Sequence, residues 1–334
     1  MGGGDTFNGE LGNDTVTFVS GWGTDTLDGG AGIDVLDFSG IAAGSGVIGI
    51  DLDGGYSFNG GGQSGTWSNF ENVIGSVRDD SLVGNGLNND LRSGEGNDNL
   101  NGGDGNDTIY GESGNARLLG GEGDDFIAGG SNGATIRGGL GDATIIGGGG
   151  ADQVLYTGLS SGVFVSLESG ISGGAGGSDS LSNIENVFGS GHADIIYGSN
   201  AKGNRLEGSN GDDKLYGLDG RDTLLGGNDN DSLYGGDDVD RLLGQSGNDR
   251  LAGGAATDFL TGGSGADTFI LSDIAHTGVG RFNRDEVRDF STADGDVMNV
   301  FLEDADSTEA GNQAFTFAGT SITDTAGEPH SHNK

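Results

Sequence analysis

Large apolar side chains recur at every ninth residue over long stretches of the chain, each two places after an acidic position. In the second half they run from Leu215 to Phe269, and a glycine keeps step five places before the acidic position, from Gly208 to Gly262. The acidic positions are Asp213, Asp222, Asp231, Asp240, Asp249, Asp258 and Asp267. The repeat reads G-G-x-G-x-D-x-U-x, where U is the apolar residue. Its x-U-x segment is too short for a helix but suits a strand with one inward side chain, and the glycine-rich segment predicts a turn.

An earlier array keeps the apolar register from Leu82 to Val154 without a slip, but its acidic position is less regular. That position reads Asp80, Asn89, Asp98, Asp107, Ala116, Asp125, Ala134, Ala143 and Asp152. The N-terminal segment carries Asp5, Asp14, Asp25 and Asp34 in the same role. The alanines keep the strand and remove the acid, which indicates either drift among stacked repeats that share their stability or an ion-free patch that binds something else.

Two similar segments interrupt the repeats. They end on matching sequences, residues 69–76 and 183–190, and alternating apolar residues within them indicate short strands. After Ile270 the period stops, and scattered aromatic residues predict a β-rich cap. The predicted organisation is N-terminal repeats 1–37, insertion 38–76, first array 77–154, insertion 155–192, second array 193–270, cap 271–328 and disordered tail 329–334.

Two nonapeptides form one coil of a flattened parallel β-helix, with the apolar residues of both strands meeting in a thin core. Each strand then pairs with the strand eighteen residues away, so the aspartate of one repeat lies about 4.8 Å from that of the second repeat onward. Two such carboxylates repel each other by on the order of 3 kcal/mol at an effective dielectric constant near 20. A cation between them reverses the sign. With no Cys and only four His in the chain, oxygen ligands dominate, which favours Ca²⁺ over Zn²⁺.

Composition narrows the possible functions further. The 334 residues include 75 Gly and one Pro, and 52 acidic residues against 14 basic ones give a net charge of −38. Such a surface repels phosphate backbones and anionic lipids, so we expect neither nucleic-acid binding nor membrane insertion. The N-terminus shows no secretory signal pattern and no run of 18 apolar residues occurs, so a cleaved Sec signal and a membrane span are not expected.

The repeats from residue 5 to residue 270 resemble those of RTX proteins, the hemolysin-type calcium-binding nonapeptide family. The resemblance implies an all-β, right-handed parallel β-roll, export by a type I exporter and an extracellular location. It also implies several Ca²⁺ ions, each held by the repeat aspartates and the backbone carbonyls of turn positions two and four. On one edge of the second array these residues are Ser209, Gly211, Asp213, Gly227, Asp229, Asp231, Gln245, Gly247, Asp249, Gly263, Gly265 and Asp267. On the other edge they are Leu218, Gly220, Asp222, Gly236, Asp238, Asp240, Gly254, Ala256 and Asp258.

This pairing predicts at least five Ca²⁺ ions within residues 208–270. In the first array only Asp80 with Asp98 and Asp107 with Asp125 form pairs of aspartates. The candidate ligands outside the second array are Asp80, Gly94, Gly96, Asp98, Gly103, Gly105, Asp107, Gly121, Gly123, Asp125, Asp152, Asp14 and Asp34.

The segment after Phe269 is similar to the end of serralysin-type secreted metalloproteases, through residues 285–291 and 310–317. No His is followed by Glu, so the H-E-x-x-H zinc motif of those enzymes is absent and no catalytic site is expected. The sequence Gly158-Leu159-Ser160-Ser161-Gly162 fits G-x-S-x-G, but its context is not strand-turn-helix.

We therefore expect a secreted, non-enzymatic β-roll that folds on binding Ca²⁺. Two alternatives stay open. The chain could be the calcium-binding C-terminal part of a larger metalloprotease or lipase. It could also be a calcium-dependent adhesin or glycan-binding module that uses aromatic residues such as Tyr56, Trp67 and Tyr156 of the interruptions. Packing in the core or in turns is the more ordinary role for such residues.

Overall fold

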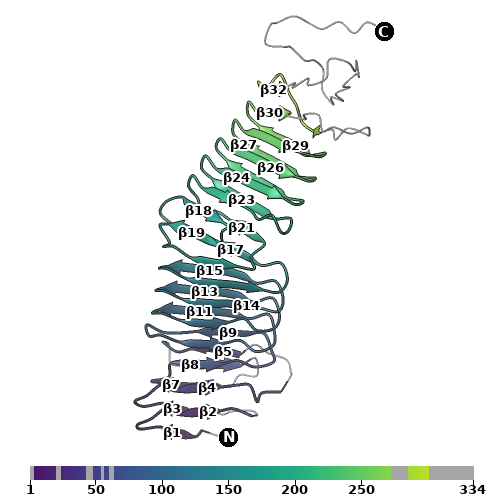
Figure 1. Cartoon of the computed structure of the whole chain (residues 1–334). Helices are drawn as coiled ribbons and strands as arrows, with labels where there is room; N and C mark the ends of the chain where they lie inside the picture. Colours follow the sequence, from purple (N-terminus) through teal and green to yellow (C-terminus); the bar gives the residue numbers. More distant parts are fainter. Residues whose placement is uncertain are drawn as a thin grey trace, which may run out of the picture. The chain divides into compact units, whose positions relative to one another are not determined.

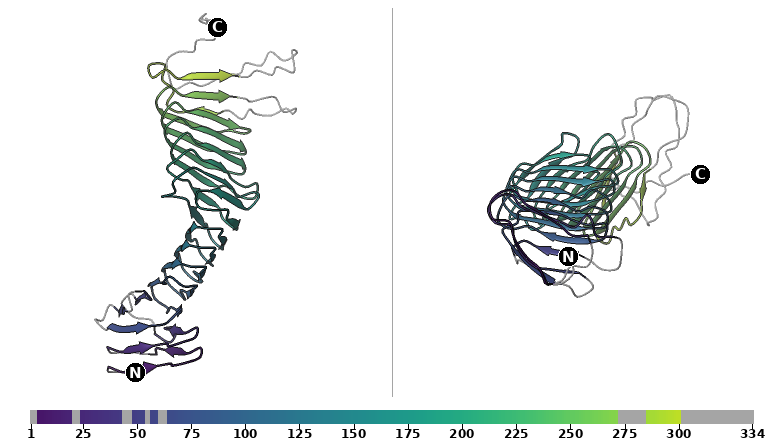
Figure 2. Two further views of the ribbon diagram at one scale, coloured as in Figure 1. Left: turned by 90° about the vertical axis from the view of Figure 1, so that its left-hand side faces the viewer. Right: turned by 90° about the horizontal axis from the view of Figure 1, so that it is seen from below.

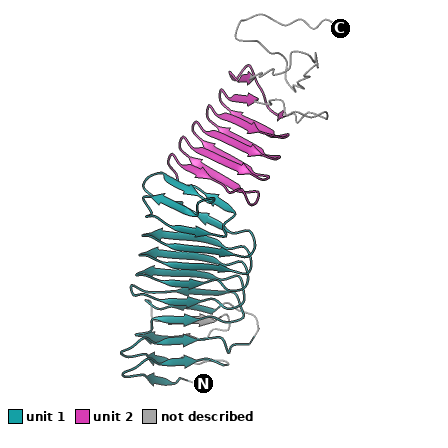
Figure 3. Ribbon diagram, in the orientation of Figure 1, with its two compact units in different colours: residues 1–190 teal, residues 191–334 magenta. Residues whose placement is uncertain are grey.

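The computed structural model describes residues 4–19, 24–42, 48–53, 56–59, 64–271 and 285–300, and its regular structure is entirely β. The chain forms two compact units, residues 1–190 and 191–334 (Figure 3). In each unit the strands of the regular repeats alternate between two sheets, and within each sheet they stack in parallel (Figures 1 and 2). The predicted parallel β-solenoid is confirmed.

In unit 1 the first sheet has the order β1 (Thr6–Asn8), β3 (Thr26–Asp28), β7 (Ser64–Ser68), β6 (Tyr56–Asn59), β5 (Ile48–Asp51), β9 (Asp80–Val83), β11 (Asn99–Asp104), β13 (Arg117–Glu122), β15 (Thr135–Leu140), β17 (Gln153–Leu155) and β21 (Asn186–Phe188). The second sheet has the order β2 (Thr15–Thr17), β4 (Val35–Asp37), β8 (Asn72–Ile74), β10 (Asp90–Arg92), β12 (Thr108–Tyr110), β14 (Phe126–Gly130), β16 (Thr144–Gly148), β20 (Ser180–Ser182), β19 (Ile171–Gly174) and β18 (Val163–Ser166).

In unit 2 the first sheet has the order β23 (Arg205–Asn210), β25 (Thr223–Asn228), β27 (Arg241–Ser246), β29 (Phe259–Ser264) and β31 (Glu286–Val287). The second sheet has the order β22 (Ile195–Tyr197), β24 (Lys214–Asp219), β26 (Ser232–Asp237), β28 (Arg250–Gly254), β30 (Thr268–Leu271) and β32 (Val297–Val300). Many array strands are six residues long, because the two turn residues after the strand also pair with the next coil, as Gly227 does with Gln245.

The strand register has the predicted period of eighteen residues. Leu206 pairs with Leu224, which pairs with Leu242 and then Leu260, and all four side chains are fully buried. The apolar residues of the two sheets thus form columns in a thin core, and each inward side chain is flanked by outward ones. Because this core is narrow, contacts between the turns at both edges also contribute to the stability of the stacked coils.

The two interruptions add antiparallel strands to different sheets. The first places β6 between β5 and β7 in the first sheet, and the second places β19 between β18 and β20 in the second sheet. Their similar endings return the chain to the solenoid in the same way. Asn69 and Asn183 both adopt positive φ, and the following glutamates, Glu71 and Glu185, accept hydrogen bonds from the N–H groups of Asp34 and Asp152.

The aromatic residues named as possible glycan contacts are structural where the side chain is described. Trp67 is 5% exposed and its Nε1 donates to the carbonyl of Asp51. Tyr156 is 6% exposed and its hydroxyl donates to Asp179. Both side chains therefore have the packing role that is more ordinary for such residues. The side chain of Tyr56 lies outside the described residues.

Exposed Asn and Asp side chains at the fifth repeat position join neighbouring turns. The N–H of Asn248 donates to Oδ1 of Asn230 over 2.9 Å, and the N–H of Ala266 donates to Oδ1 of Asn248 over 2.8 Å. Asn106 and Asp124 make the same contact in unit 1. The sequence pattern treats this position as variable, so these side chains give the coils a connection that the nonapeptide consensus does not show.

Candidate metal centres

The sixth position of the repeat, here called the ladder position, carries a carboxylate that bonds to the neighbouring coil. In unit 2, Oδ1 of Asp231 accepts the N–H of Asp213 over 2.9 Å, and Oδ1 of Asp249 accepts the N–H of Asp231 over 2.8 Å. On the opposite edge Oδ1 of Asp240 accepts the N–H of Asp222 over 2.8 Å, and Asp258 bonds to Asp240 in the same way. Each edge is thus a regular row of carboxylates fixed by backbone donors.

The second oxygen of most of these carboxylates is buried and has no hydrogen-bond partner in the described structure. This holds for Oδ2 of Asp14, Asp34, Asp98, Asp107, Asp125, Asp213, Asp222, Asp231, Asp240, Asp249 and Asp258. In unit 2 the six aspartates of that set are at most 2% exposed. A buried carboxylate oxygen without a donor costs free energy unless a cation or a proton satisfies it. The repeated orphaned oxygens therefore mark candidate positions for a cation or a proton.

Burial raises the pKa of these carboxyl groups because it penalises their charged form. The pKa rises to about 8 for Asp213 and Asp240 and to about 7 for Asp231, in each case mainly by desolvation, while backbone hydrogen bonds oppose the rise. The charges of neighbouring ladder carboxylates, such as Asp194 and Asp231 beside Asp213, raise the pKa further. Charge on the row is costly without a cation, and a divalent ion would remove that cost.

The turns that precede the ladder positions share one backbone conformation. Positions two and four adopt positive φ even where the residue is not glycine, as in Ser209 (91°), Leu218 (79°), Gln245 (79°), Asp229 (76°), Asp238 (71°) and Ala256 (85°). The glycines at the same positions share this conformation: Gly94, Gly96, Gly103, Gly105, Gly121, Gly123, Gly211, Gly220, Gly227, Gly236, Gly247, Gly254, Gly263 and Gly265. Non-glycine residues rarely adopt it, so the geometry of the coil enforces it.

Carbonyl oxygens of these positions lie against the next coil. A Cβ built on Gly227 would be 1.9 Å from the carbonyl oxygen of Ser209, and one on Gly265 would be 1.9 Å from that of Gly247. The candidate ligands proposed from the resemblance therefore gather at each edge as two carboxylates and several turn carbonyls from adjacent coils. Oxygen ligands of this kind, in a flexible number, fit Ca²⁺. Within the described residues no group of three or more His, Cys, Asp or Glu side chains is placed to hold a metal, so carbonyls would have to complete each shell.

The first glycine of the repeat leaves the room that the ladder carboxylate occupies. A Cβ on Gly226 would lie 2.2 Å from Oδ2 of Asp231 and 2.8 Å from the carbonyl oxygen of Gly244. We expect Gly226→Ala to destabilise the calcium-loaded protein by about 3 kcal/mol, because the methyl group must displace the carboxylate or separate two coils. Urea unfolding in calcium would measure this. The matched control is Gly191→Ala, whose Cβ would meet only Asn210 at 3.8 Å and should change stability by less than about 0.5 kcal/mol.

Asp80 differs from the other ladder aspartates. Its Oδ2 accepts the N–H of Ser76 over 2.6 Å and the Ser76 hydroxyl over 3.0 Å, so the chain itself satisfies the oxygen. Its Oδ1 also lies 3.2 Å from that hydroxyl. Its partner Asp98 keeps an orphaned Oδ2. Oδ1 of Asp152 accepts the N–H of Ala134. The two aspartates of the Asp80 and Asp98 pair are thus unlike in their bonding.

Three aspartates beyond the regular repeats also belong to the edges, and the nonapeptide pattern did not indicate them. Oδ1 of Asp285 accepts the N–H of Asp258, and Oδ1 of Asp296 accepts the N–H of Asp267. Asp289 accepts the N–H groups of Gly262 and Gly263. Residues 285–300 thus complete a last coil after a break in the period. The remaining parts of the predicted cap and tail, residues 272–284 and 301–334, lie outside the described residues.

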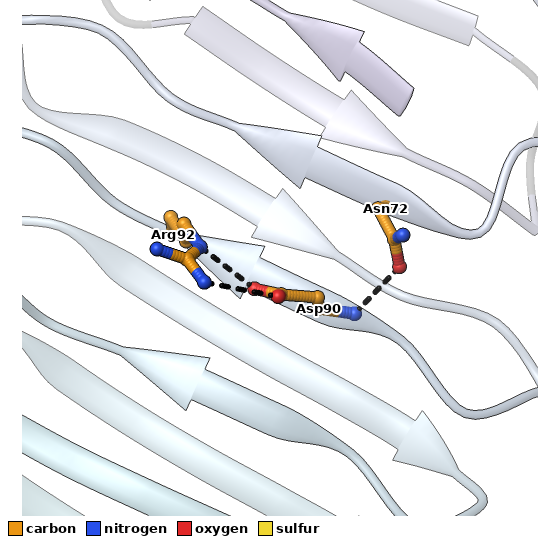
Figure 4. A network of polar contacts seen from close by, with 3 residues as sticks. All are labelled: Asn72, Asp90 and Arg92. Carbon is orange, nitrogen blue, oxygen red and sulfur yellow. Dashed lines mark hydrogen bonds and ion pairs between the residues drawn. The ribbon is translucent and has the colours of Figure 1, made fainter. Parts of the chain in front are cut away.

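Acidic residues on the flat faces of the sheets behave differently from those in the ladder. Asp90 on β10 is bonded through its side chain to Arg92, with Nε and Oδ1 3.0 Å apart, and its N–H donates to Oδ1 of Asn72 (Figure 4). Arg205 with Glu207 and Arg288 with Glu286 repeat this pairing between residues that are two apart along the chain. These surface acids are thus paired with basic side chains close by in the sequence.

Comparison with known proteins agrees with this geometry. The family model of the RTX calcium-binding nonapeptide repeat matches residues 1–36, 83–118, 104–132, 110–142, 129–156, 199–233 and 234–269, together more than half of the chain. The chain belongs to the RTX family. It is a calcium-binding β-roll protein, and repeats of this RTX architecture are typically non-catalytic. The matched segments leave out residues 37–82 and 157–198, which hold the first interruption and nearly all of the second.

No curated protein matches the chain. One similar solved structure is described as a hyperactive, Ca²⁺-dependent, β-helical antifreeze protein from an Antarctic bacterium. The alignment covers 79% of this chain and 85% of that one at 15% identity, with a TM-score of 0.26. A search of the described residues for a helix long and apolar enough to cross a membrane finds none.

Proposed function

We propose that this RTX protein is secreted and that Ca²⁺ binding outside the cell drives the folding of its regular repeats. The observation that carries this proposal is the two rows of buried Oδ2 atoms without a hydrogen-bond partner in unit 2, Asp213, Asp231 and Asp249 on one edge and Asp222, Asp240 and Asp258 on the other. At low cytosolic calcium these carboxylates are charged and repel one another, which favours an expanded chain. Millimolar external calcium then stabilises the folded state by binding to it alone.

The residues that would hold each ion come from two adjacent coils on one edge. A typical centre takes Oδ2 of Asp213 and Asp231 with the carbonyls of turn positions two and four in both coils. The ion, when bound, neutralises the two carboxylates and joins the coils. Oδ1 of Asp213 and Oδ1 of Asp231 keep their backbone donors, the N–H groups of Asp194 and Asp213, so Oδ2 of each stays available for the ion. The arrangement would bind an ion and stabilise the stacked coils.

Export through a type I exporter and an extracellular location follow from this scheme as proposals. RTX repeat proteins are usually secreted, and a chain that stays expanded until it meets calcium suits passage through a narrow exporter. The net charge of −38 belongs to the ion-free chain, and each bound Ca²⁺ would offset two of those charges.

Calcium titration into chelator-treated protein tests the proposal. We expect circular dichroism to show a gain of β signal with increasing Ca²⁺, and equilibrium dialysis to find at least five bound ions in the saturated chain. Mg²⁺ at the same concentrations is the control, since its octahedral demand and tightly held waters suit these wide carbonyl sites poorly. A full β signal in chelator that calcium leaves unchanged would overturn the proposal.

A further inference from the structure

We infer that unit 1 contains a segment that stays folded without calcium, so that the chain folds in two stages with unit 2 as the calcium-dependent one. This inference rests on the proposed function, because it concerns which ladder positions need the ion. The segment, called the alanine block, comprises residues 113–148 and contains β13 to β16. Its ladder positions are Ala116, Asp125, Ala134 and Ala143.

The alanine block has no pair of ladder carboxylates within it. Adjacent coils bring Ala116 next to Ala134 on one edge and Asp125 next to Ala143 on the other. The first pair has no carboxylate and the second has one. The coils before and after on the first edge add Asp98 beside Ala116 and Asp152 beside Ala134, again one each. On the other edge Asp107 lies beside Asp125, so a pair of ladder carboxylates stands at the start of the block. Beyond that pair, the repulsion between buried carboxylates, which opposes folding without an ion, is missing along this part of the solenoid.

Apolar packing replaces the carboxylate at these positions. Ala116, Ala134 and Ala143 are at most 3% exposed. A Cβ built on Gly111 would lie 3.0 Å from the Ala116 methyl group, and one on Gly129 would lie 2.9 Å from that of Ala134. The alanine methyl groups thus line the space next to the first glycine of the turn, where Oδ2 lies elsewhere. The strand register continues through the block without a break, from Leu118 to Ile136 and from Ile127 to Ile145.

On the edge of Ala143, the coil after the alanine block carries a ladder carboxylate, that of Asp179, and hydroxyl groups of the second interruption donate hydrogen bonds to it. Asp179 lies next to Ala143 and accepts the N–H of that alanine over 3.1 Å. Its Oδ2 accepts the hydroxyl of Ser172 over 2.8 Å and the hydroxyl of Tyr156 over 3.2 Å. All of these groups are buried. Two protein hydroxyls thus do at Asp179 what a cation would do at Asp231, and they need no calcium.

Unit 2 shows the opposite arrangement. Its ladder places two carboxylates in contact range at nearly every step, from Asp194 with Asp213 through Asp258 with Asp285. The exception is Asn204 beside Asp222. Oδ2 of Asp213, Asp222, Asp231, Asp240, Asp249 and Asp258 has no protein donor. Removing calcium should therefore expand unit 2 and leave the alanine block folded.

Hydrogen exchange of the full chain, read by mass spectrometry on peptides, tests this inference. In chelator we expect peptides of β13 to β16 to exchange at least about 100-fold more slowly than peptides of β23 to β29. Calcium should then slow the second group by a similar factor and change the first much less. Fast exchange of both groups in chelator, with recovery at one calcium concentration, would overturn the inference and leave the proposed function standing. Slow exchange of β23 to β29 in chelator would instead contradict the proposed function itself.

A gain-of-site variant gives an independent test. Ala116→Asp restores a pair with Asp98, and the first glycine of its turn, Gly111, is still present. We expect this variant to bind at least one additional Ca²⁺. In chelator, we expect the amide hydrogens of its β13 to exchange about tenfold faster than those of the unchanged protein. Ala128→Asp is the matched control, because it adds the same charge on the outward face of β14, where no ladder pair forms. Equal behaviour of the two variants in both measurements would contradict the inference.

Discussion

Replacing Asp231 by asparagine should weaken calcium binding by unit 2 and at the same time increase the fraction of that unit that folds without calcium. Asp231 lies between Asp213 and Asp249 on one edge, so its Oδ2 is shared by two candidate centres. Loss of one charged ligand from both should raise the calcium midpoint of folding at least about tenfold, since ligand charge sets affinity in such sites.

The opposite effect in chelator follows from burial. Desolvation raises the pKa of Asp231 to about 7, so its charge opposes folding near neutral pH. Asparagine keeps an oxygen for the N–H of Asp213 and removes the charge. We expect the ion-free folded state to gain on the order of 2 kcal/mol. The chain already uses this solution at Asn89, whose Nδ2 donates to the carbonyl of Glu71 over 2.6 Å.

Asp212→Asn is the matched control for this experiment. Asp212 is exposed and lies next to the ladder residue Asp213, and its Oδ1 accepts the N–H of Asn230 over 2.9 Å, a bond that asparagine can keep. The variant therefore changes the net charge equally and removes a nearby charge that raises the pKa of Asp231, but it removes no candidate ligand. Circular dichroism of both variants in chelator and during calcium titration gives the comparison. If Asp231→Asn and Asp212→Asn shifted the calcium midpoint equally, general charge reduction and not a bound ion would explain the result.

The solenoid and its register could be predicted because two nine-residue repeats make one coil, so the sequence period gives the spacing of paired strands directly. Leu206 and Leu224 lie eighteen residues apart and pair in the structure, as the spacing requires. The stacking of ladder aspartates follows from the same arithmetic. A constant turn length fixes the position of both the inward side chain and the carboxylate, so the sequence of a regular array determines where they lie.

Features that depend on breaks in the period could not be predicted. Asp285 and Asp296 enter the ladder after a break in the repeat, and their spacing from Asp258 and Asp267 is no longer eighteen. Asp179 reaches its place next to Ala143 through an antiparallel hairpin, and only the folded chain shows that Ser172 and Tyr156 bond to it. Side chains that an insertion brings together have no fixed spacing in the sequence, so the repeat pattern does not predict their contact.

Acid should replace calcium as the agent that stabilises unit 2. Desolvation by burial raises the pKa of Asp240 to about 8 and that of Asp222 to about 6, well above the ordinary value for aspartate. In the ion-free protein the folded state therefore binds more protons than the unfolded chain between about pH 4 and pH 8. The stability contributed by these protons is fully present below about pH 4 and is lost as the pH rises through 6 to 8. In chelator, the β signal of unit 2 should grow as the pH falls from about 8 to about 5.

Calcium should reverse the direction of this dependence. Ca²⁺ binds the deprotonated carboxylates, so protons compete with it and the calcium midpoint should rise as the pH falls. At saturating calcium the β signal should stay high at about pH 8, where the chelated protein has lost it. Circular dichroism and urea unfolding at matched pH values, with and without calcium, measure both curves. Asp231→Asn should make both pH dependences weaker. Asp231 takes up a proton in the chelated protein and would bind Ca²⁺ in the loaded protein, and asparagine does neither. Parallel curves with and without calcium would show that the buried carboxylates are not where the ion binds.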